Sequence, residues 1–385
     1  MKSHDPADAP IPDPQRRAPG AVPVRGRGAT FNPGNRYRRD EREAYDDGWS
    51  HPVPDAPAED APPRQVATTV TIQRARTIIA RNDSPDIPFT QSINPYQGCE
   101  HGCIYCYARP THAYLDLSPG LEFETKLFAK PDAAALLRAE LGKPGYKCDP
   151  IALGSNTDPY QPIEREWKVT RSVLEVLAEH EHPFTIVTKS ALVERDIDLI
   201  APMAKKRMAR VYLSVTTLDR ALARRMEPRA AAPHRRLQAL KTLADAGIPV
   251  GVMVAPLIPQ LNDRDLETIL EAAAANGAQS AGWVLLRLPR EVAPLFREWL
   301  DVHYPLRAGH IMSLVQQMRG GRDYDSAFGT RMRGNGTLAA LLEKRFAIAC
   351  RRLGLNRGRE HTGLDVSRFR PPKPDGAERQ GELFG

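Results

Sequence analysis

The stretch NPYQGCEHGCIYCYARPTHAY, from Asn94 to Tyr114, holds three of the five cysteines in this 385-residue chain. Cys99, Cys103 and Cys106 are separated by three and then two residues. No stretch approaches the roughly 18–20 consecutive apolar residues of a membrane span, and the start of the chain lacks the apolar segment of a secretory signal. We therefore expect a cytoplasmic protein with reduced thiols, in which this cluster predicts metal binding or catalysis rather than disulfides.

Three thiolates at this spacing can converge on one metal centre. A structural zinc site is closed by four protein ligands, and the fourth could be His101 or His112, although no second C-x2-C pair follows. A [4Fe–4S] cluster normally takes four thiolates, so three would leave one iron open for chemistry. A zinc site and an iron–sulfur cluster both stay open on these residues alone.

Outward from this stretch, short runs rich in Val and Ile alternate with helical patterns. The apolar runs are residues 92–98, 150–155, 184–190, 210–216, 250–256 and 282–288. Apolar residues at helical spacing fill 164–180, 192–208, 233–247 and 263–277. Six such units favour a partial (β/α)6 barrel of parallel strands over an open doubly wound sheet. Chemistry in that architecture lies at the C-terminal ends of the strands, and the cysteines directly follow the first strand.

Composition divides the chain into four regions, with 41% hydrophobic and 26% charged residues overall, as in globular proteins. Residues 1–65 are rich in Pro and Arg and are predicted to form a disordered arm. Residues 66–304 form the predicted barrel, residues 305–365 a helical extension, and residues 366–385 a flexible tail.

With Tyr105 as the aromatic residue, the pattern C-x3-C-x-aromatic-C resembles the signature of the radical S-adenosylmethionine (SAM) superfamily. The resemblance implies an enzyme in which Cys99, Cys103 and Cys106 bind a [4Fe–4S] cluster whose open iron is chelated by SAM. In that family one electron from the cluster cleaves SAM, and a 5′-deoxyadenosyl radical abstracts hydrogen from the substrate. The partial barrel is also that family's fold, and its chemistry calls for a low-potential electron donor of the flavodoxin or ferredoxin type.

The segments GSNTDPYQPIE, TKS, LSVTTLD and PLIPQLND narrow the resemblance to the branch that contains spore photoproduct lyase and proteins labelled DNA repair photolyases. This resemblance implies contacts with SAM from Tyr105, Ser155, Thr157, Asp158, Lys189 and Ser214. A lysine ammonium and hydroxyl donors suit a carboxylate in a partly dry pocket. The alternatives are that the residues around Thr157 cap the next helix and that Lys189 is an exposed loop lysine.

The chain departs from the lyase at Ser155, where the lyase carries a cysteine that returns hydrogen to the substrate radical. A serine O–H bond is too strong for that role, so thymine-dimer cleavage is not expected here. Cys148 is predicted to precede its strand rather than lie at the functional end, and Cys350 to lie in the core. Arg229, Arg235 and Arg236 follow the fourth strand and could bind SAM or a phosphate, but a solvated helix face is the favoured expectation.

A net charge of +7 suits acidic partners, which include nucleic acid and an electron donor with an acidic face. Near the end of the chain, Gln380, Leu383 and Phe384 resemble the Gln-x-x-Leu-Phe peptides by which bacterial repair proteins dock on the sliding clamp. The favoured expectation is a radical SAM enzyme that acts on a nucleic acid. The rivals are a zinc-bound nucleic-acid binding protein and a cluster protein without SAM chemistry.

Overall fold

The computed structural model describes residues 24–37, 66–357 and 363–372. The strands are β1 (Thr69–Ile72), β2 (Ile79–Arg81), β3 (Gln91–Ile93), β4 (Tyr96–Gln97), β5 (Lys126–Ala129), β6 (Ile151–Leu153), β7 (Phe184–Thr188), β8 (Ala209–Ser214), β9 (Val250–Leu257) and β10 (Ser280–Leu285). They form a seven-stranded sheet in the order β10-β9-β8-β7-β6-β3-β2 and a three-stranded sheet in the order β1-β5-β4.

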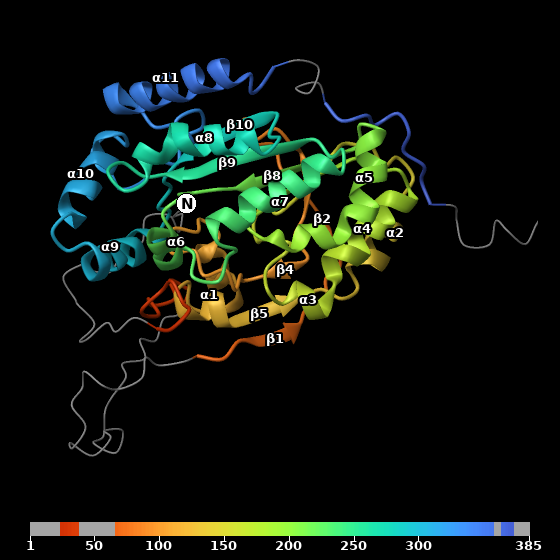
Figure 1. Cartoon of the computed structure of the whole chain (residues 1–385). Coiled ribbons are helices and arrows are strands. Elements are labelled where there is room, and N and C mark those ends of the chain that lie inside the picture. The colour runs from red at the N-terminus through yellow and green to blue at the C-terminus, as the bar shows by residue number, and fades with distance from the viewer. Residues whose placement is uncertain (1–23, 38–65, 358–362, 373–385) are drawn as a thin grey trace, which may run out of the picture.

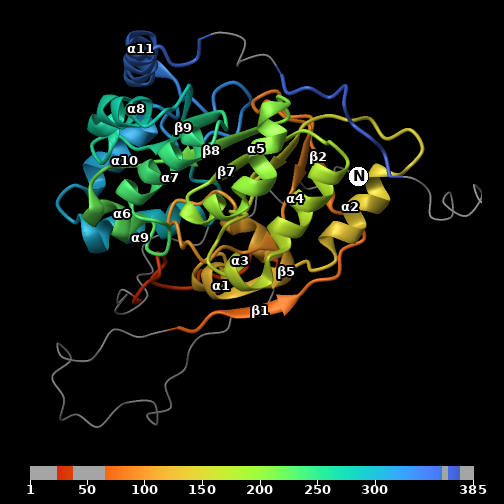
Figure 2. The same ribbon diagram turned by 45° about the vertical axis from the view of Figure 1, so that its right-hand side comes forward.

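Helices connect the strands, and within the described residues three more follow the last strand, β10. They are α1 (Leu121–Thr125), α2 (Ala133–Leu141), α3 (Glu164–Trp167), α4 (Val169–Glu179), α5 (Ile197–Lys205), α6 (Arg220–Met226), α7 (Pro233–Asp245), α8 (Leu266–Ala275), α9 (Val292–His303), α10 (Ala308–Gln317) and α11 (Gly336–Leu353), with 3-10 turns η2 (Arg109–Leu115), η3 (Ala191–Asp196) and η4 (Asp263–Asp265). Figures 1 and 2 show α2, α4, α5, α7 and α8 outside the large sheet and α11 beyond α8.

The six strands β3 and β6 to β10 are all parallel to their neighbours, with β2 added antiparallel at the edge. This confirms the predicted partial barrel with its helical extension. Each predicted strand contains an observed one, since residues 184–190 hold β7 and residues 210–216 hold most of β8. The helical patterns at 164–180, 192–208, 233–247 and 263–277 likewise contain α3 with α4, α5, α7 and α8.

The strands bury one face against the helices and leave the other partly open. In β7, Phe184 and Ile186 are fully buried in the main core, whereas the alternating residues Thr185 and Val187 are half-buried. Since successive side chains of a strand point to opposite faces, the half-buried set lines the barrel interior. The interior face of β7 is therefore less completely buried than the face that packs against the helices.

Two terminal segments differ from the predicted disorder. Residues 24–37, inside the predicted 1–65 arm, pack on the barrel, and the rest of that arm lies outside the described residues. Residues 363–372 also pack, since the Phe369 ring lies 5.5 Å from that of Tyr146 and 5.2 Å from that of His182. No helix in the described ranges has the length and apolarity of a membrane span.

Candidate functional site

The three cysteines lie on a loop that joins β4 to η2 at the C-terminal edge of the first parallel strand. Its main chain is tied on two sides. The Cys99 N–H donates to the Phe123 carbonyl at 3.0 Å, and the Ile104 N–H donates to the Met226 carbonyl at 3.0 Å. The Arg229 N–H donates to the His101 carbonyl at 3.2 Å. The loop is thus fixed between α1 on one side and the segment after α6 on the other.

A fully buried carboxylate, Glu124, supports the loop from below. It forms an ion pair with Arg109 at 2.5 Å, and neither side chain is exposed. It also accepts hydrogen bonds from the main-chain N–H groups of Gly28 at 2.9 Å and Ala29 at 2.8 Å. The segment 24–37 is therefore held against the cysteine loop by a charge that two main-chain donors and one guanidinium share.

Residues 24–37 lie so close to the cysteine loop that no side chain fits at the point of contact. A Cβ on Gly28 would lie 1.9 Å from the Gly102 carbonyl oxygen, and one on Gly102 would lie 2.7 Å from Glu124 Oε2. Gly102 also has a φ of +66°, a conformation that residues with a Cβ rarely adopt. Glycine at both positions is a steric requirement of the loop and its cover.

The thiols are enclosed. Cys99 and Cys103 are buried and Cys106 is half-buried. Burial raises the pKa of Cys103 to about 12 and that of Cys99 well above the ordinary value, and the neighbouring thiols add to both effects. Because a metal binds the thiolate, cluster binding at this loop would release protons.

The donor set fits a [4Fe–4S] cluster in which each thiolate binds a different iron. Across the ranges that the structure describes, no three His, Cys, Asp or Glu side chains gather around a point that could hold a single metal ion. Thiolates on separate iron atoms of one cluster do not have to share such a point. Three soft donors on one fixed loop, enclosed on both sides, are the residues that would hold the cluster.

Lys189 and Ser214 follow and end the neighbouring strands β7 and β8. The Lys189 ammonium lies 5.8 Å from the centre of the Tyr105 ring, and no residue in the described ranges accepts a hydrogen bond from it. Burial opposes its charge, but attraction to Cys103 and Glu227 outweighs this effect and raises the pKa of Lys189. A half-buried cation of this kind, beside the cysteine loop, suits a carboxylate ligand.

Behind Lys189 lies a buried polar network that sequence reasoning missed. Glu227 accepts hydrogen bonds from Tyr105 and Arg236, and from Thr216 at 2.6 Å. Arg236 also donates to the Ser214 carbonyl at 3.0 Å and is 1% exposed. The prediction that Arg236 lies on a solvated helix face is therefore wrong.

The neighbouring arginines behave differently from Arg236. Arg235 pairs with Glu194, and Arg229 pairs with Glu100 at 2.8 Å, while both keep more than a third of their side chains exposed. The solvated reading holds for these two residues. Arg236 alone of the three turns inward, where its guanidinium joins the end of β8 to the segment after α6.

The turn after β6 carries the other predicted contacts, and Asn94 organises it. Asn94 Oδ1 accepts from the N–H groups of Asn156 at 3.0 Å and Thr157 at 3.3 Å, and lies 3.4 Å from the Ser155 hydroxyl. The Thr157 hydroxyl donates to the Tyr96 carbonyl at 2.8 Å. These side chains support the turn after β6. They do not cap the next helix, since α3 has Ile163 at its N-cap and no side-chain cap hydrogen bond, so the capping alternative is wrong.

Asp158 is fully engaged by the protein. It accepts from the Lys189 N–H at 2.8 Å and the Thr188 hydroxyl at 2.6 Å, and it lies 3.3 Å from His101 Nδ1. Burial opposes its charge, but His101 and these hydrogen bonds outweigh that effect and lower the pKa of Asp158 to about 2. It therefore joins the end of β7 to the cysteine loop and presents Lys189.

Tyr107 stands at the exposed edge of the loop. It is 44% exposed, its hydroxyl donates to the Ser155 carbonyl, and the Arg287 guanidinium lies 4.8 Å from its ring centre. Cys148 lies ahead of β6, at the N-terminal end, and Cys350 is buried in α11, as predicted for both. Gln380, Leu383 and Phe384 lie outside the described residues.

Taken together, one loop supplies three thiols and the ends of β7 and β8 supply a cation and a hydroxyl beside it. Comparison with known proteins agrees with this arrangement, since residues 93–273 match the family model described as the radical SAM superfamily. The match begins at the end of β3 and ends within α8.

Relatives by sequence are themselves uncharacterized. One from Mycobacterium tuberculosis is 38% identical over 221 residues, which cover 57% of this chain and 65% of the relative. Another from Methanocaldococcus jannaschii is 29% identical over 214 residues, or 55% of this chain and 76% of the relative. The chain thus spans less than two thirds of the length of the mycobacterial relative.

Among solved structures, spore photoproduct lyase with bound AdoMet and dinucleoside spore photoproduct aligns over 74% of this chain and 80% of its own. The TM-score is 0.53 and the identity 17%. A likeness at this identity establishes a shared fold.

Proposed function

We propose that the protein is a radical SAM enzyme that cleaves SAM reductively and abstracts hydrogen from a nucleic-acid substrate, since residues 93–273 match the family model of that superfamily. The observation that carries the proposal is the three-thiol loop lying beside the Lys189 cation at the C-terminal edge of the parallel strands. This edge is where barrels of this kind hold their chemistry.

In this proposal Cys99, Cys103 and Cys106 would hold a [4Fe–4S] cluster, which when bound would supply the electron for the reductive cleavage of SAM. The protein's own side chains would bind and orient SAM. Lys189 carries a positive charge without a described acceptor and is placed to receive the SAM carboxylate. Ser214, at the end of β8, supplies a hydroxyl nearby, and Glu227 with Arg236 fixes Tyr105 and the end of that strand.

A nucleic-acid substrate is supported by charge and by the exposed edge of the site. The chain carries a net charge of +7, and an exposed aromatic ring, Tyr107, lies against the Arg287 guanidinium beside the loop. Aromatic rings and guanidinium planes are common platforms for unpaired bases. Spore photoproduct lyase, which shares the fold, has been solved with a dinucleoside spore photoproduct. Ser155 in place of a thiol implies that hydrogen is not returned by that residue.

The test is anaerobic. The protein is reconstituted with iron and sulfide, reduced with dithionite and given SAM, and 5′-deoxyadenosine is measured by chromatography beside Cys103→Ala. Wild type should form 5′-deoxyadenosine and Cys103→Ala should form none. Zinc in protein purified anaerobically, with no cleavage after reconstitution, would support the zinc-bound rival. An intact cluster that neither binds nor cleaves SAM, with or without oligonucleotides, would support the electron-transfer rival.

We also propose that the C-terminal tail docks on a sliding clamp through Gln380, Leu383 and Phe384. The support is the sequence pattern and its place near the end of the chain. A peptide of the last ten residues should bind the cognate clamp saturably by calorimetry. The same peptide with Leu383→Ala and Phe384→Ala is the control, and equal binding by both peptides rules the docking out.

A further inference from the structure

Four tyrosine or phenylalanine side chains are exposed within the ranges that the structure describes, and an arginine lies against each of them. They are Tyr37, Tyr107, Tyr114 and Phe328. Phe328 belongs to the opposite end of the sheet from the cysteine loop, because the N–H of the next residue donates at 2.7 Å to Asp86, in the turn that leads into β3 from its N-terminal end. The three tyrosines lie at the C-terminal edge of the strands, beside the cysteine loop.

Tyr37 and Tyr114 form one surface, which we call the tyrosine pair. Their ring centres lie 5.4 Å apart with the planes inclined by 32°, and the side chains are 46% and 68% exposed. Tyr114 lies in η2, which follows the cysteine loop in the chain, whereas Tyr37 ends the segment 24–37 that packs on the loop. Much of each ring is therefore free to contact a planar group.

Arg36 holds the tyrosine pair in place. Its guanidinium carbon lies 4.6 Å from the Tyr37 ring centre and 5.3 Å from that of Tyr114. It donates to Glu291 at 2.7 Å, directly before α9, and to the Pro110 carbonyl of η2 at 3.2 Å. Figures 1 and 2 show the segment 24–37 beside α9 and α1. Because Glu291 offsets its charge, Arg36 fixes the positions of the rings, and rings already in position bind at a lower entropic cost.

A second arginine beside the tyrosine pair keeps its charge available. Arg290, in the loop between β10 and α9, is exposed, and no carboxylate in the described ranges pairs with it. Hydrogen bonding to Tyr114, and then to Arg36 and Arg290, lowers the pKa of Tyr37, so the Arg290 side chain reaches the hydroxyl of that ring. One free cation thus adjoins two exposed rings.

The tyrosine pair continues the exposed edge that carries Tyr107. The guanidinium that lies 4.8 Å from the Tyr107 ring belongs to Arg287, three residues before Arg290 in the same loop. Three residues of extended chain span at most about 11 Å, so the two arginines are close neighbours. The three exposed tyrosines therefore follow one edge of the site, from the cysteine loop to the end of η2.

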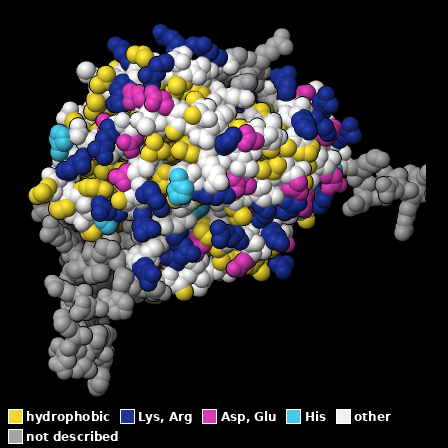
Figure 3. Space-filling view, in the orientation of Figure 1, with side chains coloured by type: hydrophobic (Ala, Val, Ile, Leu, Met, Phe, Trp, Pro, Cys, Tyr) yellow, Lys and Arg dark blue, Asp and Glu magenta, His cyan; other side chains and the backbone are white. Residues whose placement is uncertain are grey.

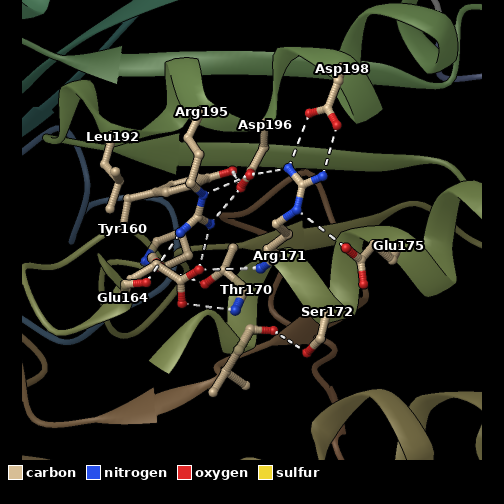
Figure 4. A network of polar contacts seen from close by, with 12 residues as sticks. Tyr160, Glu164, Thr170, Arg171, Ser172, Glu175, Leu192, Arg195, Asp196 and Asp198 are labelled. Carbon is tan, nitrogen blue, oxygen red and sulfur yellow. Dashed lines mark hydrogen bonds and ion pairs between the residues drawn. The ribbon is translucent and has the colours of Figure 1, made fainter. Parts of the chain in front are cut away.

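Other surfaces do not offer a comparable feature. Figure 3 shows Lys and Arg side chains interleaved with acidic and apolar ones over the face it presents, without a field of one sign. The polar network in Figure 4 is satisfied internally, because Arg171 and Arg195 pair there with four carboxylates, Glu164, Glu175, Asp196 and Asp198. Exposed ring surface, rather than net charge, distinguishes the edge beside the cysteine loop.

We propose that the tyrosine pair stacks unpaired bases of a single-stranded nucleic acid that runs along this edge into the site, with Arg290 beside the adjoining phosphate. The inference rests on the proposed function, which takes a nucleic acid as substrate, and adds that the strand is single around the reacting nucleotide. Aromatic rings stack on every kind of base, and guanidinium groups contact bases and phosphates. A base within a duplex is already stacked on its neighbours and has to leave them first.

The test separates stacking from phosphate contact. Binding of labelled oligothymidylate to the reconstituted holoprotein is measured anaerobically by fluorescence anisotropy, beside an abasic strand of the same length and a duplex. The variants are Tyr37→Ala, Tyr114→Ala, their double and Tyr114→Phe, with folding checked by circular dichroism. Phe328→Ala is the matched control, because that ring is 60% exposed and lies 4.7 Å from the Arg331 guanidinium at the opposite end of the strands.

The double variant should bind oligothymidylate at least tenfold more weakly, because stacking on one ring strengthens binding about five- to a hundredfold. Its affinity for the abasic strand and the duplex should stay within twofold of wild type, and Tyr114→Phe and Phe328→Ala should match wild type throughout. A strand that carries 2-aminopurine should also lose fluorescence on binding to wild type, as this base does when it stacks, and this measurement needs no variant.

Unchanged oligothymidylate affinity in the double variant overturns the inference and leaves the tyrosine pair to a protein partner. An equal loss for the abasic strand overturns it as well, because phosphate contacts would then account for the loss, and so does 2-aminopurine fluorescence that stays constant on binding. These three results leave the proposed function standing. Wild type that binds no oligonucleotide of any form refutes both the stacking and the nucleic-acid substrate, whereas formation of 5′-deoxyadenosine tests the SAM chemistry separately.

Discussion

The Glu227–Arg236 pair is buried deeply enough that removing one partner should be costly. The two side chains are 0% and 1% exposed. In Arg236→Met, a side chain of similar length fills the space but leaves Glu227 with only Tyr105 and Thr216 as partners. Breaking a buried pair by removing one member costs about 3–5 kcal/mol.

The pKa of Glu227 gives a second way to work out the free energy that this buried carboxylate contributes to stability. Burial opposes its charge, but Arg236 and Lys189 outweigh this and lower its pKa to about 2. An unfolded glutamate titrates near about 4.3, and each pKa unit corresponds to about 1.4 kcal/mol, so the ionised carboxylate contributes about 3 kcal/mol at pH 7. Since the folded pKa is the lower one, this stabilisation is present above pH ~4.3 and is lost as pH falls toward 2.

The assay is equilibrium unfolding in urea at pH 7, followed by circular dichroism, for Arg236→Met, Glu227→Gln and the double variant. We expect Arg236→Met to lose about 3 kcal/mol and the double variant to lose at least about 2 kcal/mol less than the sum of the singles. The exposed control Arg352→Met should lose less than about 1 kcal/mol. A loss below about 1 kcal/mol in Arg236→Met, or additive singles, would refute the reasoning.

Three further predictions concern Lys189, the contact of Gly28 with the cysteine loop, and two buried histidines. Lys189→Met should weaken SAM binding by about ten- to a hundredfold, since hydrogen bonds to charged groups contribute about 1.5–3 kcal/mol, and it should leave the iron content unchanged. A SAM titration followed by electron paramagnetic resonance measures the affinity. Unaltered affinity contradicts the assignment of Lys189 to the SAM carboxylate. Gly28→Ala should lower the free energy of unfolding in urea by about 1–3 kcal/mol and speed proteolysis within 24–37, because the new Cβ would lie 1.9 Å from the Gly102 carbonyl oxygen. Gly34→Ala is the control and should change neither quantity, because a Cβ there meets open space. Burial lowers the pKa of His112 and of His182 to about 4, so the folded state favours their neutral forms. The free energy of unfolding should therefore fall by up to about 3 kcal/mol for each histidine as pH drops from 6.5 to 4. A free energy of unfolding that does not change over this pH range, measured in urea, would count against buried neutral rings.

The parts of the fold that repeat locally could be read from the sequence. Strand and helix periodicity located β6 to β10 and their crossovers, and the cysteine spacing located the loop, because both signals are carried by residues near each other in the chain. The same local reading placed Cys148 before its strand and Cys350 in the core.

The supports of the site could not be read this way, because they join distant residues. Glu124 binds Gly28 from 96 residues away, and Tyr105 meets Glu227 from 122 residues away. Composition made residues 24–37 look disordered, because the contacts that hold them are made with distant residues. Two of their main-chain donors meet the buried Glu124, and Val24 and Ala29 join a core cluster formed by other parts of the chain. The inward turn of Arg236 likewise depends on a carboxylate that periodicity does not reveal.

The cover formed by residues 24–37 sets the shortest useful form of this protein. A truncation at residue 66, where the composition changes, would remove both main-chain donors from Glu124 and leave that carboxylate with Arg109 alone. It would also uncover the Gly102 side of the cysteine loop, against which Gly28 packs. Shortened versions should therefore begin before Val24, so that the Gly28 and Ala29 donors stay in place against Glu124.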